Sequence, residues 1–223
     1  FETVERVPID RFDAEGLGRI AAGLVKKYPL IAEDYLIKLE DDFPESRHQS
    51  YADYTRAQLF IQQGAYEDAR WHLKQFRAKS PMHPLAIDGA LDYATTLTQT
   101  EAYEEAQTVL EDLLRQRQAK GRPHARALLA LSRNEEAAGN LERAIPYAQR
   151  VYNVYRAYHD LAAEAYWMSA RQFQEIGNPI AAYKTLDEML GDPQITRFPL
   201  ADEAKAKRRS LLESLPEGAL DDT

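Results

Sequence analysis

The side chains that most often carry out chemistry in proteins are present in this sequence, but not at the spacings that catalysis or metal binding requires. The acidic pairs Asp41-Asp42 and Glu135-Glu136 are neighbours, so their carboxylates diverge on a helix and cannot act as a paired acid and base. There is no glycine-rich phosphate loop, no G-x-S-x-G nucleophile elbow and no cysteine. The histidines show no H-x-x-x-H pair and no carboxylate at metal-ligand spacing; they are His48, His72, His83, His124 and His159. The sequence therefore predicts a protein that is not an enzyme and has no cofactor and no bound metal.

Composition narrows the class of partner. The chain of 223 residues has a formal net charge of −8 and no extended lysine or arginine cluster, so nucleic acid is not an expected partner. No apolar run approaches the length of a membrane helix, and we expect no membrane insertion by the chain itself. Because the sequence begins at Phe1 rather than at Met, any signal peptide or any lipid or membrane anchor would lie upstream of Phe1.

The elements that must position any site are predicted to be helices. Apolar residues recur at spacings of three and four along the chain, and alternation with period two is nowhere sustained. The pattern predicts helices over 14–27, 31–42, 47–63, 66–79, 84–99, 102–119, 123–138, 141–157, 160–176, 179–190 and 199–214.

Two series of small residues recur along these predicted helices with a nearly constant period in the high thirties. A repeat of this length with a small residue on each of two successive helices is typical of stacked helical hairpins, because small side chains let helices pack closely. Larger apolar residues follow on the same face of each second helix, for example Leu73 and Phe76 after Ala69. The two series are Ala69, Ala106, Ala144 and Ala182, and Ala57, Ala94, Ser132 and Ala170.

The period also predicts the domain organisation. A further copy through Ala32 adds a repeat at the N-terminus, so that five hairpins and a final helix form one all-α unit over residues 13–215. Residues 1–12 are an expected N-terminal extension and 216–223 an expected frayed tail. The predicted repeats cover about 13–46, 50–83, 87–120, 125–158 and 163–196, followed by a capping helix over 199–214.

These repeats resemble the tetratricopeptide repeat (TPR) family. The match is carried by Tyr54, Ala57, Phe60, Gly64, Tyr66, Ala69 and Pro81, and by Ala170, Phe173, Gly177 and Ala182 in the last repeat. The resemblance implies an all-α, right-handed superhelical solenoid whose concave groove binds a partner protein or an extended peptide. The repeat period in this sequence is longer than the usual period of the family, which predicts longer second helices or longer connections.

A narrower resemblance concerns the junction Phe43-Pro44-Glu45-Ser46 together with the long repeats. Both features are similar to bacterial envelope TPR proteins of the outer-membrane assembly lipoprotein and Tol–Pal coordinator type. This similarity implies a periplasmic or outer-membrane-associated protein that serves envelope assembly or maintenance. A cytoplasmic location is the alternative.

The TPR resemblance also implies which residues meet the partner, because first helices line the groove with the face opposite the small residues. Arg133 and Arg171 occupy equivalent positions on neighbouring repeats, so they would point into one trough and clamp a carboxylate. The alternative is that both form ordinary ion pairs with Glu135, Glu136 or Glu175. The implied groove residues are Tyr51, Tyr54, Gln58, Gln62, Leu91, Thr95, Gln99, Arg126, Leu129, Arg133, Trp167, Arg171 and Gln174.

Two further alternatives stay open at the level of the sequence. Tyr152, Tyr155 and Tyr158 lie at steps of three and form either an aromatic surface for a partner or filling between repeats. The whole chain is either a scaffold for a partner or a structural, oligomerisation or docking module of a larger complex, with the helix at 199–214 as its docking surface. The oligomeric state is not predicted.

Overall fold

A computed structural model describes residues 8–216 and 218–220 of the chain. Over these residues it contains eleven α-helices and three short 3₁₀ helices and no β-strand. The contacts divide the chain between Thr100 and Glu101 into two compact units, and each unit is described by itself.

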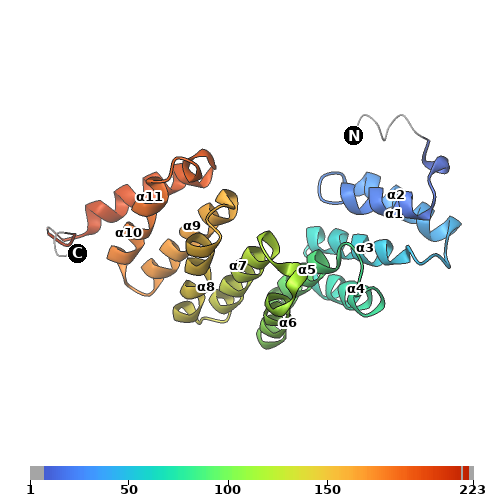
Figure 1. Ribbon diagram of the computed structural model, residues 1–223, viewed down its shortest axis with the longest axis horizontal. Helices are drawn as coiled ribbons and strands as arrows, with labels where there is room; N and C mark the ends of the chain where they lie inside the picture. Colours follow the sequence, from blue (N-terminus) through green and yellow to red (C-terminus); the bar gives the residue numbers. More distant parts are fainter. Residues whose placement is uncertain (1–7, 217, 221–223) are drawn as a thin grey trace. The chain divides into compact units, whose positions relative to one another are not determined.

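The first unit contains five α-helices, drawn from blue to green in Figure 1. Consecutive helices pack against each other as hairpins, α1 with α2 and α3 with α4, while α3 also contacts α1 and α2, and α5 packs on α4. A short 3₁₀ helix, η1, precedes them. The bounds are η1 Ile9–Arg11, α1 Ala14–Leu24, α2 Pro29–Asp42, α3 Gln49–Gln63, α4 Tyr66–Lys79 and α5 Ala86–Gln99.

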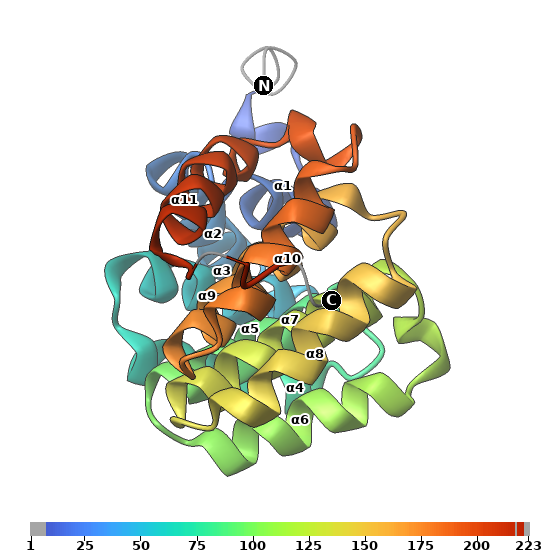
Figure 2. The same ribbon diagram turned by 90° about the vertical axis from the view of Figure 1, so that its left-hand side faces the viewer.

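The second unit continues the same pattern. Helices α7 and α8 lie side by side in Figure 2, and α9 packs on α7, α8 and α10. The last helix, α11, covers α10 and contacts α9 and η3, so it occupies the place of a cap. The bounds are α6 Tyr103–Arg115, η2 Arg117–Ala119, α7 Arg122–Ala137, α8 Leu141–Val154, α9 His159–Glu175, α10 Pro179–Leu190, η3 Ile195–Arg197 and α11 Leu200–Ser214.

The predicted all-α architecture of consecutive helical hairpins is confirmed, and every predicted helix is present. Three helices end three or four residues earlier than the sequence predicts: α1 at Leu24, α6 at Arg115 and α8 at Val154. At α6 the reason is local, since Gln116 adopts an extended backbone and the chain continues as η2. The right-handed superhelical winding of the whole chain stays a prediction.

The ends of the chain are described in part. Of the predicted extension at 1–12, residues 1–7 lie outside the described residues, and Ile9 and Phe12 pack against the core of the first unit. Of the predicted tail at 216–223, residues 217 and 221–223 lie outside the described residues.

The two series of small residues lie where helices touch. All eight of these side chains are at most 3% exposed, which confirms that each repeat buries them. On α4 the small Ala69 is followed on the same face by Leu73 and Phe76, and all three are fully buried. The small residue therefore sets the helix separation, and the larger ones fill the space beside it.

The turns inside the hairpins use one backbone conformation. Gly64, Gly139 and Gly177 each stand five residues before a repeat alanine and adopt positive φ angles of 73°, 80° and 77°. Glu101 occupies the same place in its repeat and adopts a φ of 59°, although its side chain carries a Cβ. Residues other than glycine are sterically strained in this left-handed conformation.

We therefore expect Glu101→Gly to raise the free energy of unfolding by about 1 kcal/mol, because glycine removes the left-handed strain. Gly177→Ala should lower it by a similar amount, and no atom stands near the position of the added Cβ, so the effect is conformational. Urea unfolding of both variants measures the two changes. A Glu101→Gly variant less stable than the parent would contradict the argument.

Candidate functional site

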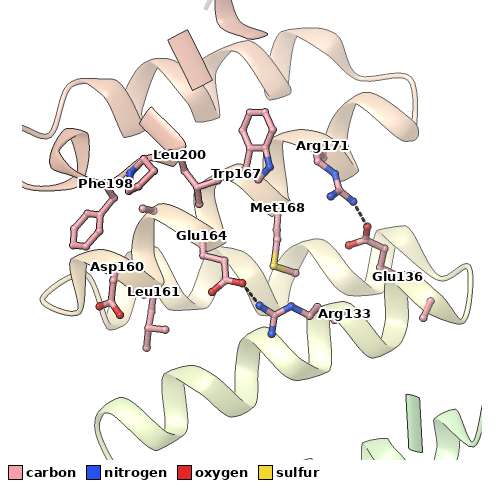
Figure 3. A pocket seen from close by; sticks show the side chains of 13 residues that line it. Arg133, Glu136, Asp160, Leu161, Glu164, Trp167, Met168, Arg171, Phe198 and Leu200 are labelled. Carbon is pink, nitrogen blue, oxygen red and sulfur yellow. Dashed lines mark hydrogen bonds and ion pairs between the residues drawn. The ribbon is translucent and has the colours of Figure 1, made fainter. Parts of the chain in front are cut away.

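A groove in the second unit lies between α7, α9 and the chain that joins η3 to α11 (Figure 3). Its volume is about 680 Å³, which is in the range of ligand-binding pockets. We call it the α7–α9 groove. It is lined by Arg133, Glu136, Ala137, Asp160, Leu161, Ala163, Glu164, Trp167, Met168, Arg171, Phe198, Pro199 and Leu200.

Helical spacing explains why α9 supplies most of the lining. Asp160, Glu164, Trp167 and Arg171 follow one another at steps of four, three and four residues, so they share one face of the helix. The opposite face carries Tyr166 and other buried core residues. Core packing on one side of α9 thus holds its polar and aromatic face in the groove.

Three ion pairs connect α7 to α9 along the groove. Arg133 pairs with Glu164, and Arg171 pairs with Glu136, as the dashed lines in Figure 3 mark. At the start of both helices, Arg122 donates from two nitrogens to the two carboxylate oxygens of Asp160. These hydrogen bonds hold the pKa of the Asp160 carboxyl below its usual value.

A buried polar network holds one of these carboxylates in place. Gln172 is fully buried on α9, and its Nε2 donates to Glu136 Oε2 at 2.8 Å and to Ser132 Oγ at 3.0 Å. Arg171 donates to the other oxygen of Glu136. Glu136 is therefore oriented both by the buried Gln172 and by Arg171 in the groove, and Glu136 in turn orients Arg171.

The remaining lining is apolar. Leu161 and Met168 are buried, while Trp167, Phe198 and Leu200 are half-buried and present part of their surface to the groove. Phe198 follows η3 in an extended conformation, which places it beside the first residue of α11. An apolar surface is thus set next to a row of paired charges.

The structure brings together three of the residues that the sequence singles out: Arg133, Trp167 and Arg171 all line the α7–α9 groove. Each arginine is already engaged in an ion pair, as the alternative interpretation holds. Arg171 pairs with Glu136, which that interpretation names, whereas Arg133 pairs with Glu164, which it does not. Both side chains stay accessible, with 51% of Arg133 and 43% of Arg171 exposed.

The other implied residues of this unit lie outside the lining. Leu129 is buried in the core, Arg126 is half-buried and Gln174 is exposed near the end of α9. The α7 residues that line the groove are Arg133, Glu136 and Ala137, all in the C-terminal half of the helix.

In the first unit most of the implied residues are engaged in packing. Tyr54 and Gln58 are buried on α3 and both donate to Asp92 Oδ2 on α5, at 3.1 and 2.7 Å. Tyr51 and Leu91 are also buried. Three are exposed: Gln62, whose amide donates to the Val25 carbonyl, and Thr95 and Gln99.

Tyr51 belongs to an aromatic cluster with His83. The two rings meet edge to face with centroids 4.3 Å apart, and the Phe76 ring also meets the imidazole edge to face, at 5.1 Å. His83 Nδ1 accepts a hydrogen bond from the backbone N–H of Leu85, so this nitrogen carries no proton. Burial, together with the nearby charge of His48, lowers the pKa of His83 below its ordinary 6.5.

We expect the free energy of unfolding to fall as the pH decreases below about 6.5, because the unfolded chain then binds a proton that folded His83 resists. His83→Gln should flatten this dependence between pH 7.5 and 5.5 in urea unfolding. Met82→Gln, next to it in the same connection and exposed, is the control and should keep the parent slope. An unchanged slope in His83→Gln would contradict the expectation.

The tyrosine series on and after α8 is mainly structural. Tyr152 is buried and stacks on Tyr166 with ring centroids 3.9 Å apart. Tyr155 and Tyr158 are half-buried against the same core, and the Tyr155 hydroxyl lies 2.7 Å from His124 Nδ1. The burial of these three tyrosines favours the interpretation that they pack between repeats.

The groove also contains residues that were not anticipated, among them Glu164, Met168, Phe198 and Leu200. The helical spacing of Glu164 and Met168 relative to Trp167 and Arg171 would have placed them on the same face of α9. Phe198 and Leu200 follow an irregular connection after α10, and no periodicity indicates where it packs.

No family model matches the chain, and no curated protein matches it significantly. Among the described residues, no group of three histidine, cysteine or acidic side chains is placed to hold a metal ion. Within the same residues, no helix is sufficiently long and apolar to span a membrane.

Proposed function

We propose that this protein is a non-catalytic helical-repeat scaffold of the TPR type that holds a partner protein or an extended peptide in the α7–α9 groove. The observation that carries the proposal is the groove itself, where an accessible apolar surface adjoins two accessible arginines and a tryptophan. Tryptophan and arginine are the side chains that most often dominate binding energy at protein interfaces.

The shape of the groove favours a segment of chain over a flat protein surface. A volume of about 680 Å³ accommodates several side chains of a peptide, and the groove is open along α9. Helices from neighbouring repeats form its walls, and a segment lying in it would contact α7, α9 and the start of α11 together. Peptide recognition by a helical groove uses a few anchors of this kind.

We further propose that the protein acts in the envelope of a bacterium, in its assembly or maintenance. Support comes from the Phe43-Pro44-Glu45-Ser46 junction, which follows the end of α2 and leads to α3 in the first unit. Cell fractionation of the native protein tests this setting. Recovery in the cytoplasm would contradict it.

Selection of peptides from a random library against the protein tests the binding function. Trp71 and Trp167 are the only tryptophans, so Trp71→Phe leaves Trp167 as the sole reporter in the chain. We expect selected peptides to shift the Trp167 emission in this variant and to compete with one another. Selected peptides that bind without any change in Trp167 emission would place the site elsewhere and overturn the proposal.

A second candidate function, a docking or oligomerisation module, is favoured by one feature of the first unit. Leu30 and Ile37 stand seven residues apart on α2, and 78% and 47% of their surfaces are exposed. Light scattering tests it. If the chain self-associates through this face, the measured mass of the parent protein should exceed that of a monomer. The double variant Leu30→Gln/Ile37→Gln should then have the mass of a monomer.

A further inference from the structure

We propose that the segment held in the α7–α9 groove is acidic, with glutamate or aspartate carboxylates alternating with apolar side chains. This inference rests on the proposed function and specifies the chemistry of the partner. It follows from which hydrogen-bonding groups in the groove are already used and which are still available.

Most carboxylate oxygens of the groove already accept one hydrogen bond from the protein. Both oxygens of Asp160 accept from Arg122, and both oxygens of Glu136 accept, one from Arg171 and the other from Gln172. Of these groove carboxylates, within the part of the chain that the structure describes, only Glu164 keeps an oxygen without a protein donor. The lining holds three carboxylates and two arginines, but the arginines are the more accessible: 51% of Arg133 and 43% of Arg171 are exposed, against 22% of Glu136, 34% of Glu164 and 38% of Asp160. A ligand therefore meets more of the cationic than of the anionic side chains.

The two arginines of the groove have N–H groups beyond those that donate to their glutamate partners. A guanidinium carries five N–H groups, yet Arg133 and Arg171 each direct a single nitrogen, one NH2, to their glutamate partners. In the described structure the indole N–H of Trp167 meets no acceptor. These donors sit in or beside the opening, where a ligand carboxylate or peptide carbonyl reaches them without breaking the existing pairs.

The apolar lining accounts for the second half of the pattern. Leu161, Met168, Phe198 and Leu200 offer surface for aliphatic or aromatic side chains. Figure 3 shows Arg133 and Phe198 on different sides of the groove, from α7 and from the connection to α11. Side chains of an extended peptide alternate between two sides. A ligand that alternates acidic and apolar residues would therefore direct its carboxylates to the arginine side of the groove and its apolar side chains to the Phe198 side.

The experiment uses three synthetic hexapeptides with acetylated and amidated ends. All alternate a polar residue with leucine or phenylalanine, and the polar residue is glutamate, glutamine or lysine. Each is titrated into the Trp71→Phe chain at 50 mM and 300 mM NaCl while Trp167 emission is recorded. We expect the glutamate peptide to bind about tenfold more tightly than the glutamine peptide at low salt, and the lysine peptide to bind most weakly.

Variants locate the effect in the groove. Arg133→Gln/Arg171→Gln should abolish the preference for glutamate over glutamine, because the carboxylates lose their partners. Arg150→Gln, an exposed arginine on α8 outside the groove, should retain it. Circular dichroism melts confirm that each variant is folded.

The outcomes separate the two proposals. Equal affinity for the glutamate and glutamine peptides, or tightest binding of the lysine peptide, would overturn the acidic ligand and leave a peptide-binding groove. No Trp167 response to any of the three would also overturn the acidic ligand. The peptide selection described above then decides the binding function independently.

Discussion

Trp167→Ala is expected to weaken the binding of a groove peptide by about 30-fold or more, which corresponds to about 2 kcal/mol. Trp167 is half-buried at the centre of the residues that α9 contributes to the α7–α9 groove. Its large rigid surface is desolvated by a ligand at little cost in side-chain entropy, and its indole N–H gains an acceptor. Because the substitution removes the fluorescent reporter, fluorescence anisotropy of a labelled peptide is the suitable measurement.

The second tryptophan provides a matched control. Trp71 on α4 is 57% exposed and lies in the other unit, so Trp71→Ala removes a similar side chain without touching the groove. Its affinity for the same peptide should equal that of the parent. A loss of equal size in both variants would show that the effect is not local to the groove.

The largest expected effect on stability comes from a repeat alanine. Ala69→Leu adds three carbon atoms at a fully buried position on α4, a helix that packs against both α3 and α5. We expect the free energy of unfolding to decrease by about 3 kcal/mol, because the helices must separate or Leu73 and Phe76 must leave their rotamers. Urea unfolding monitored by circular dichroism measures the change.

Ala78→Leu on the same helix is the control for this substitution. Ala78 is exposed, so leucine there changes helix propensity and volume without entering the core, and its effect should stay within about 0.5 kcal/mol. If the two variants lost equal stability, the small residues would not be needed for close helix packing.

The helices and their contacts could be predicted from the sequence because both are encoded locally. Apolar residues at spacings of three and four report the buried face of each helix, and the nearly constant repeat period places the contact positions again in each hairpin. Glu101 shows that glycine alone does not mark every left-handed turn residue in the repeats. This residue adopts the positive φ that glycine adopts at positions 64, 139 and 177, although it carries a Cβ.

The candidate site was predictable only in part. The resemblance places Arg133, Trp167 and Arg171 on the groove face of neighbouring repeats, and they do line one groove. The acid that pairs with Arg133 was not anticipated, since Glu164 is distant in the sequence and on another helix. Side-chain partners of this kind depend on how helices are rotated against each other, which the repeat period alone does not specify.

Tyr54 and Gln58 illustrate the opposite error, in which an expected binding face is used inside the protein. Both donate to Asp92 on α5, so the polar surface that the resemblance assigns to a ligand joins α3 to α5. The repeat position of a residue gives its face on the helix. It does not give the chemistry of the residue opposite.

The ion pairs between α7 and α9 have a consequence for protein engineering. Every charged side chain that lines the groove has its partner on the other of these two helices, and part of the apolar lining comes from the connection to α11. A designer who transplants α9 alone into another repeat array would carry over its arginine without the glutamate that orients it. The smallest portable recognition cassette in this chain is therefore the stretch from α7 to α11, and lengthening the array elsewhere would leave that cassette intact.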